Sequence, residues 1–194
     1  MAGELTGRNA LVLGAERPLG RRAAVALGEA GADVACVTLS EDTKAEFAVN
    51  SAANEFWAMG RKAIALTSDS GATTVHEAIA DATAELGPIR ILVYHAPAPI
   101  AYEAFEGLRS DPAVIVLVAD DAEVDDAMAL LLWTRQLADQ GLRANALLPA
   151  ALAPGAGAAG LTPHDAPAAD LASAVVYLAS DASAAIEGAA VTYG

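Results

Sequence analysis

The sequence predicts an α/β protein in which a doubly wound parallel β-sheet is covered by helices on both faces. Two observations predict this fold class. Strand-like and helix-like patterns alternate regularly along the chain. The strand-like runs are continuously apolar, as expected for strands that are buried on both faces. Because no domain boundary is visible in the 194 residues, we expect one domain over residues 1–194.

The first half of the chain is predicted to form four strands and three helices. Each strand is a short apolar run, and each helix repeats apolar residues at helical spacing. We expect Ser40 to cap the second helix, and glycines to end the second and third helices. The predicted strands are 9–15, 33–39, 62–68 and 89–96, and the predicted helices are 18–32, 40–59 and 73–87.

The second half is predicted to add three strands and two helices, which gives about seven strands in all. A stretch of small residues at 150–163 is predicted to be a loop. The predicted strands are 113–119, 142–149 and 189–194, and the predicted helices are 121–140 and 170–180.

Composition and charge exclude several classes of protein. The net charge of −14 argues against a nucleic-acid partner, because lysine and arginine contacts to phosphate supply most of that affinity. Hydrophobic residues make up 55% of the chain, yet no apolar run approaches the roughly 20 residues of a membrane span. We therefore assign the apolar excess to a buried sheet and a subunit interface. The N-terminus lacks a signal-peptide pattern, and the single Cys36 is expected to be a buried thiol, so a cytoplasmic location is expected.

The stretch LVLGAERPLG at 11–20 has the layout of a strand, a glycine-containing turn and a helix start. Such a turn can hold the pyrophosphate of a dinucleotide. Pro18 opposes this function because it brings ring atoms and removes an N–H donor. Proline is also favoured as the first residue of a helix, so the turn can equally be structural.

Five stretches, in order along the chain, together resemble the short-chain dehydrogenase/reductase family. The resemblance implies a seven-stranded Rossmann fold and hydride transfer between NAD(P) and an alcohol or carbonyl. It also implies a long helix between strands four and five, which the short segment 98–112 leaves shortened or missing. The stretches are LVLGAERPLGRRAAVALGEAGADV, GRKAIALTSD, AELGPIRILVYHAP, TRQLADQGLRANALLPA and VVYLASDASAAIEGAAVTYG.

The family's cofactor motifs are only partly present in this chain. Its phosphate loop, Thr-Gly-x-x-x-Gly-x-Gly, keeps two glycines but has Pro18 at the middle one, and its Asn-Asn-Ala-Gly reads Tyr-His-Ala-Pro at 94–97. Arg17, with Thr38 in place of an acidic ribose clamp, favours NADP over NAD. We expect no cofactor. If NADP(H) binds, the resemblance assigns it to Gly14, Arg17, Leu19, Gly20, Asp69 and Ala96.

The family's Ser-Tyr-Lys chemistry has no counterpart in the sequence. The resemblance aligns the tyrosine with Glu123, the lysine with Ala127, and the serine with Asp120 or Ala119. No lysine follows Lys62, so the Tyr-x-x-x-Lys motif is absent. In the family the lysine lowers the pKa of the tyrosine, which can then exchange a proton near neutral pH.

Three other residues are weak catalytic candidates: His95, Tyr94 and Asp120. His95 follows strand four, at the carboxyl edge of the sheet where active sites form, and a histidine there can be a general base. It can also be a hydrogen-bonded structural side chain, which we favour because the sequence specifies no partner group for it.

The acidic run DDAEVDD at 120–126 has two interpretations. It could supply oxygen ligands to a divalent cation. It could also begin a helix, with Asp120 as the N-cap and Glu123 completing a capping box. We favour the helix start and predict no metal site, because the spacing matches no known ion-binding loop.

The helix that follows is apolar on most faces, and its Leu130–Leu137 segment with Trp133 is predicted to be an interface. The C-terminal strand 189–194 is predicted to be a second contact. These features predict a structural or regulatory subunit, either in a homo-oligomer or beside a complete paralogue of the family. The alternatives are an NADP(H)-binding sensor, or an atypical oxidoreductase that uses other residues of the same cleft.

Overall fold

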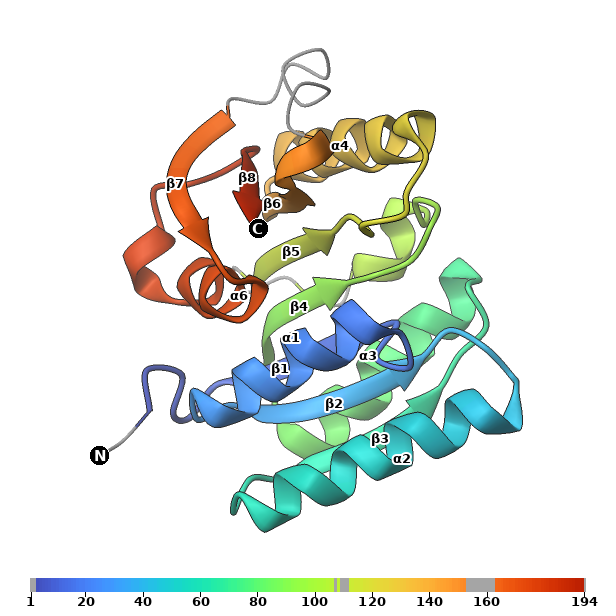
Figure 1. Ribbon diagram of the computed structural model, residues 1–194. Helices are drawn as coiled ribbons and strands as arrows, with labels where there is room; N and C mark the ends of the chain where they lie inside the picture. Colours follow the sequence, from blue (N-terminus) through green and yellow to red (C-terminus); the bar gives the residue numbers. More distant parts are fainter. Residues whose placement is uncertain (1–2, 107, 109–111, 153–162, 194) are drawn as a thin grey trace.

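The computed structural model describes residues 3–106, 108, 112–152 and 163–193. Its centre is one sheet of eight strands in the order β3-β2-β1-β4-β5-β6-β8-β7 (Figure 1). Every neighbouring pair is parallel, as predicted. The strands are β1 Asn9–Leu13, β2 Asp33–Thr38, β3 Ala63–Thr67, β4 Ile89–Tyr94, β5 Ala113–Leu117, β6 Arg143–Pro149, β7 Pro163–Ala169 and β8 Ala190–Tyr193.

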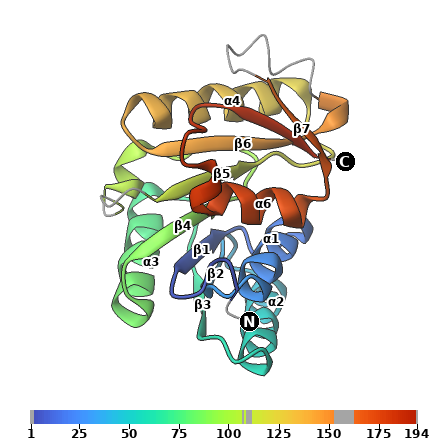
Figure 2. The ribbon, with the colours of Figure 1, turned by 90° about the vertical axis from the view of Figure 1, so that its left-hand side faces the viewer.

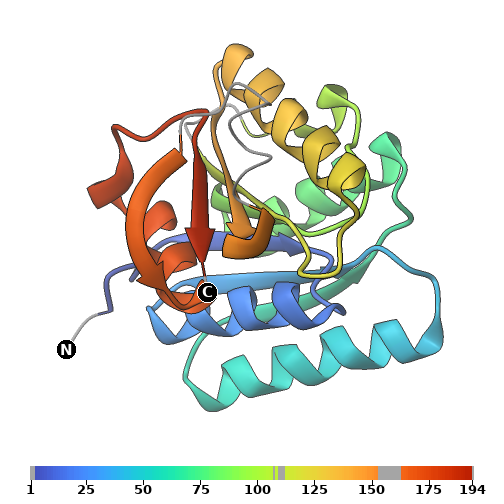
Figure 3. The same cartoon turned by 45° about the horizontal axis from the view of Figure 1, so that its top comes forward.

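Helices cover both faces of the sheet (Figures 2 and 3). One buried apolar cluster joins a face of the sheet to α1, α2 and α6, and a second joins the opposite face to α3, η1 and α4. This confirms the doubly wound fold. The helices are α1 Pro18–Glu29, α2 Thr43–Ala58, α3 Ala72–Leu86, α4 Val124–Asp139 and α6 Leu171–Ala179, with short 3-10 turns η1 Tyr102–Phe105, η2 Ala150–Leu152 and η3 Asp181–Ser183.

Two predictions about single residues are confirmed, and one about a helix cap is wrong. Pro18 is the first residue of α1, and Cys36 is a buried thiol whose pKa burial raises to about 12. Ser40, however, does not cap α2. Asp42 does, because its carboxylate accepts from the N–H of Lys44 at 3.3 Å, while the hydroxyl of Ser40 accepts from the N–H of Asp42 at 3.2 Å. The cap therefore lies two residues later than predicted.

The sheet has one strand more than the seven predicted. β7 is the outermost strand and pairs with β8, with a register shift between residues 164 and 169. Its prolines at 163 and 167 are tolerated because an edge strand needs ladder bonds on one side only. Most of the loop predicted at 150–163 lies outside the described residues. Because β7 covers β8, the C-terminal strand is not the sheet edge in this structure, and Gly194 lies outside the described residues.

The described residues between β4 and β5 form a single 3-10 turn, η1, in agreement with the shortened connection. This turn packs against α4 and corrects one prediction about that helix. Trp133 is only 5% exposed, and its ring lies 4.7 Å from that of Tyr94 and 5.8 Å from that of Phe105. Trp133 therefore has partners within its own chain, because Tyr94 of β4 and Phe105 of η1 pack against its ring.

In the part of the chain that the structure describes, no helix combines the length and the apolar character needed to cross a membrane.

Candidate functional site

The turns that follow β1, β4 and β5 meet at the carboxyl edge of the sheet, where ligands bind in open α/β folds. They enclose a cavity of about 200 Å³. The cavity therefore lies where the sequence placed its cofactor and catalytic candidates. Its lining residues are Arg17, His95, Ala96, Pro97, Ala119, Asp121, Ala122, Asp126 and Leu130.

The packing of the backbone accounts for both glycines of the first turn. Gly14 has φ of +81°, and a Cβ there would lie 1.9 Å from the carbonyl oxygen of His95. A Cβ on Gly20 would lie 2.2 Å from the carbonyl oxygen of Gly14. Both positions exclude a side chain whether or not a ligand is present, so these glycines are not evidence for a phosphate. Pro18, at the middle glycine position of the motif, is exposed at the start of α1.

Several N–H groups of this turn donate to the protein itself. Those of Gly14 and Ala15 both donate to the carbonyl of Val37, at 2.9 and 3.1 Å, and that of Arg17 donates to Gly14 at 3.1 Å. Pro18 has no N–H to offer. The turn therefore directs fewer donors outward than a helix start that cradles a pyrophosphate.

A carboxylate that the sequence analysis missed lies beside this turn. Glu16 has a side chain only 12% exposed, with one oxygen 3.7 Å from Nε of Arg17 and the other accepting from the N–H of Leu39 at 3.4 Å. Leu39 follows Thr38, the position that the family resemblance assigns to the ribose clamp. A negative charge here offsets the cation of Arg17 and would repel the 2′-phosphate of NADP if that cofactor bound.

Thr38 and Asp69, which the family resemblance associates with cofactor binding, each form hydrogen bonds within their own loop. The hydroxyl of Thr38 is buried and accepts from the N–H of Ser40 at 3.1 Å. Asp69 accepts from the hydroxyl of Thr74 and from the N–H of Gly71, and these bonds, that of Thr74 foremost, lower the pKa of its carboxyl. Asp69 therefore holds the turn into α3.

His95 follows β4 and is held firmly. Its N–H donates to the carbonyl of Leu13 at 2.9 Å, and its imidazole Nδ1 lies 3.2 Å from the carbonyl oxygen of Leu117. The residue is 4% exposed, and this burial lowers the pKa of the imidazole. Because a carbonyl can only accept, Nδ1 carries the hydrogen, and the neutral ring therefore has a free lone pair on Nε2.

The structure places Tyr94 in the core and not in the cavity lining. Its side chain is fully buried beside Trp133, and its hydroxyl donates to the carbonyl of Ala98. Burial raises the pKa of this phenol well above its ordinary value. Tyr94 is thus positioned to stabilise the packing of α4.

Asp120 does not cap α4, and the predicted capping box is wrong. The N-cap is Glu123, whose side chain makes no capping bond, because a turn from Ala119 to Ala122 precedes the helix. Asp120 instead accepts from the hydroxyl of Tyr193, in β8, at 2.9 Å. Of the acidic run, Asp121 and Asp126 line the cavity, and among the described residues no three His, Cys, Asp or Glu side chains gather closely enough to hold a metal ion.

The two positions that align with the family's tyrosine and lysine also lie on α4. Glu123 is exposed at its start, and Ala127 is buried in the apolar cluster beneath it. A lysine at 127 would have to leave this cluster to reach the cavity.

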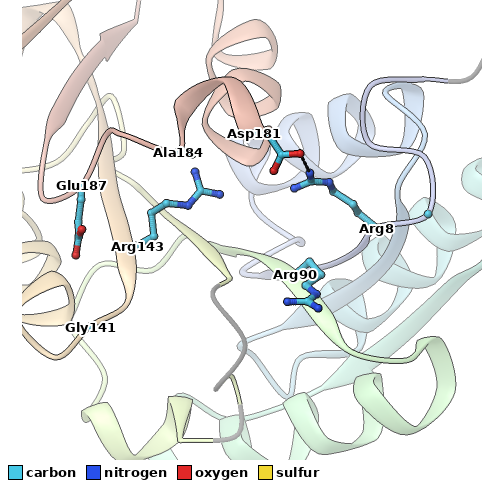
Figure 4. Close-up of a pocket in the computed structure, with 8 residues that line it drawn as sticks. Arg8, Arg90, Gly141, Arg143, Asp181, Ala184 and Glu187 are labelled. Carbon is cyan, nitrogen blue, oxygen red and sulfur yellow. Dashed lines mark ion pairs between the residues drawn. The ribbon is translucent and has the colours of Figure 1, made fainter.

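A second pocket, of about 450 Å³, lies at the opposite end of the sheet, and three arginines line it (Figure 4). Arg8 pairs with Asp181 at 2.6 Å and donates to the carbonyl of Ala179 at 3.2 Å. Arg143 donates to the hydroxyl of Ser183 at 3.0 Å and to the carbonyl of Leu178 at 3.4 Å. These cations satisfy the carbonyl end of α6, where a positive charge is favourable. The third arginine is Arg90, from β4.

The sheet order and the glycine turn define the chain as a Rossmann-type α/β protein. It belongs to the short chain dehydrogenase family, whose sequence model matches residues 8–112. A short chain dehydrogenase of Pseudocercospora fijiensis is 36% identical over 92 residues, which are 47% of this chain and 28% of that protein. The chain thus matches little more than a quarter of that relative's length.

Solved structures show the same fold across nearly the whole chain. Hydroxysteroid dehydrogenase from Escherichia coli superposes with a TM-score of 0.72 at 20% identity, over 98% of this chain and 97% of its own. A blue fluorescent protein from a metagenomic library, solved in complex with NADPH, superposes with a TM-score of 0.71 at 21% identity, over 97% of both chains. A short-chain type dehydrogenase/reductase from Mycobacterium marinum has a TM-score of 0.71 at 19% identity, over 98% and 94%.

Proposed function

We propose that this chain is a non-catalytic member of the family that serves as a structural or regulatory subunit of a homo- or hetero-oligomer. One observation carries the proposal. Asp121 and Asp126 line the cavity at the carboxyl edge, whereas no lysine follows Lys62 in the sequence. The start of α4 therefore brings two carboxylates and no lysine to the cleft, where the hydride-transfer chemistry of the family would need the cation of a lysine.

A tyrosine at the end of β8 supports the same conclusion. A tyrosine that protonates a carbonyl needs a neighbouring cation to lower its pKa. Tyr193 is buried and bonded to the carboxylate of Asp120, and both burial and this carboxylate raise the pKa of its phenol. The pairing is electrostatically the reverse of a Tyr–Lys pair, and it favours a phenol that keeps its proton.

The size of the cavity also supports a scaffold over a dinucleotide enzyme. Sites for drug-sized ligands occupy roughly 300–1,000 Å³. The cavity at the carboxyl edge holds about 200 Å³. Glu16 and Pro18 add an opposing charge and a missing donor on the phosphate side.

We assign the subunit contact to the outer face of α4. Val124 and Leu132 are 61% and 47% exposed, and Met128 lies between them at helical spacing. An apolar stripe at i, i+4 and i+8 suits packing against a second helix. Trp133 supports the helix from within the chain and does not contribute to this contact.

An NADP(H)-binding sensor is the second candidate, favoured by Arg17. Its side chain lines the cavity and remains 41% exposed. The metagenomic blue fluorescent protein, which has the same fold, was solved with NADPH. In this alternative the cofactor binds without hydride transfer.

Thermal unfolding with NADPH, NADP⁺, NADH and NAD⁺ separates the candidates. A ligand at a hundred times its Kd stabilises the folded state by about 2.7 kcal/mol. We expect no shift in Tm and no NADPH oxidation with a panel of carbonyl compounds. A shift of several degrees without turnover would establish the sensor, and turnover would establish an atypical oxidoreductase.

Light scattering after size exclusion tests the subunit contact. We expect an oligomer that Leu132→Glu dissociates, because a buried, unpaired carboxylate is costly in an apolar interface. Gln140→Glu, an exposed change at the end of the same helix, is the control and should leave the mass unchanged. A monomeric wild-type chain would contradict the homo-oligomer and leave co-purification with a paralogue as the test of the hetero-oligomer.

A further inference from the structure

The lining of the carboxyl-edge cavity is polar in a specific pattern. Arg17, from the turn after β1, brings a guanidinium to the lining, and Asp121 and Asp126, from the segment after β5 and the start of α4, bring carboxylates. Arg17 is only loosely engaged, since its ion pair with Glu16 spans 3.7 Å and exceeds hydrogen-bonding distance. The cavity therefore has one cation with spare donors and two acceptor groups of opposite charge.

His95 is a third acceptor, and its geometry is fixed by the protein. Nδ1 donates to the carbonyl of Leu117, so the lone pair of the neutral ring is on Nε2. Among the described residues no group forms a hydrogen bond with Nε2. Every buried side-chain nitrogen or oxygen of these residues has a partner, so Nε2 is an accessible atom. Because His95 lines the cavity, we place Nε2 at its open space. His95, which is only 4% exposed, thus presents the lone pair of Nε2 to this space as an unused acceptor.

We propose that this cavity binds a small zwitterion, of which a free α-amino acid with a short side chain is the best match. The ammonium group has three donors, and Asp121, Asp126 and Nε2 of His95 are three acceptors for it. The carboxylate of the same ligand pairs with the guanidinium of Arg17, whose fork suits carboxylate geometry. The proposal rests on the proposed function, because a dinucleotide would occupy the same space.

The volume sets the size of the ligand. About 200 Å³ holds roughly six or seven water molecules, at about 30 Å³ each. Glycine, alanine and serine fit this limit, whereas an aromatic amino acid does not. Electrostatic attraction alone does not favour a plain anion, because two carboxylates line the cavity together with one arginine.

Titration calorimetry with glycine, L-alanine and L-serine tests the site directly. We expect saturable binding with a Kd of roughly 1 mM or tighter. Acetate and methylammonium, which carry one half of the zwitterion each, should bind at least about tenfold more weakly. Binding of acetate as tight as that of serine would overturn the proposal, and so would the absence of saturable binding by all three amino acids.

Two pairs of matched variants locate the binding. Arg17→Gln and Asp126→Asn should each weaken serine binding at least about tenfold. Arg22→Gln in α1 and Asp125→Asn in α4 make the same charge changes nearby but outside the cavity lining, and should leave the affinity for serine within about twofold. An equal loss of serine affinity in Arg17→Gln and Arg22→Gln, or in Asp126→Asn and Asp125→Asn, would overturn the site.

Nitrogen NMR of the imidazole supplies a readout that does not depend on affinity. The Nδ1–H tautomer of His95 should be seen in the free protein, with Nε2 shifting as serine saturates. An unchanged Nε2 signal at saturation would overturn the assigned role of His95. If neither amino acids nor NADPH bind, the zwitterion site is overturned and the scaffold stands, whereas binding of NADPH alone would overturn both.

Discussion

The two ends of the sheet differ in charge, since basic side chains outnumber acidic ones in the amino-edge pocket and acidic side chains outnumber basic ones in the carboxyl-edge cavity. At the amino edge Arg8, Arg90 and Arg143 line one pocket, three of the eleven basic residues of the chain. At the carboxyl edge Asp121 and Asp126 share a cavity with a single arginine. Arg8 and Arg143 lie beside the C-terminus of α6, and Asp121 and Asp126 lie at the N-terminus of α4, so these charges complement the dipoles of the two helices.

This difference teaches what each end is suited to do. A dinucleotide site at the carboxyl edge uses the positive helix start to attract phosphate, and carboxylates there cancel that attraction. At the amino edge Arg8 and Arg143 are engaged by carbonyls, by Asp181 and by Ser183, so these two arginines stabilise the fold. The charge pattern thus favours a structural role for both ends, and leaves the carboxyl edge with room for a small ligand.

The largest expected effect compares a glycine from each end. Gly14→Ala should destabilise the protein by more than about 3 kcal/mol, because φ is positive and the new Cβ would overlap the carbonyl of His95. Gly141→Ala, at the amino edge, has φ of +84° but open space, and should cost about 1–2 kcal/mol. Urea unfolding of both variants checks the comparison, and equal losses would show that close packing does not explain Gly14.

Removal of an amino-edge cation should have the next largest effect. Arg143→Met keeps the apolar stem but loses the bonds to Ser183 and Leu178, and we expect a loss of about 1–2 kcal/mol in the free energy of unfolding. Arg17→Gln, at the other edge, should change it by less than about 0.5 kcal/mol, since its ion pair is long and partly exposed. Chemical denaturation measures both, and the reverse order would contradict the structural role of the amino edge.

Loss of the hydrogen bond between Tyr193 and Asp120 should have a smaller effect on stability. Tyr193→Phe removes the phenol hydroxyl and should lower stability by about 1 kcal/mol. Asp120→Asn keeps an acceptor and should cost less. A gain in stability in Tyr193→Phe would indicate that the buried hydroxyl is not well satisfied by Asp120.

The smallest effect is a pH dependence from His95. Its folded pKa lies below that of the unfolded chain because of burial, so the unfolded state binds more protons as the pH falls below about 6.5. The free energy of unfolding should therefore decrease as the pH falls from 7 toward the folded pKa. His95→Asn, which can still donate to Leu117, should flatten this part of the profile. An identical profile in the variant would contradict a buried, neutral His95.

Local patterns were sufficient to predict most of the fold, and distance along the chain explains what they missed. Apolar runs and helical spacing predicted the strands and helices, and Pro18 was correctly expected to start a helix. The bond from Tyr193 to Asp120 joins residues 73 positions apart, so no local pattern contains it. The position of the Glu16 side chain likewise depends on a distant segment, because its carboxylate accepts from the N–H of Leu39, just after β2.

One missed feature had a signal in the sequence. Arg8, Arg90 and Arg143 each lie at or next to the first residue of a predicted strand. Because parallel strands begin at the same edge, the topology alone brings such residues to one end of the sheet. The strand β7 had no comparable signal, since its proline-containing sequence matches an edge strand only after its neighbour is known.

The close approaches at Gly14 and Gly20 have a consequence for how related sequences are interpreted. The turn between the first strand and helix cannot be built with larger residues at these two positions, whatever the cleft contains. A chain can therefore lose every contact to a nucleotide and still keep both glycines. The middle position of the motif, proline here, is exposed at the start of α1, so the residue at this position is the more informative one for deciding whether the turn can hold a nucleotide.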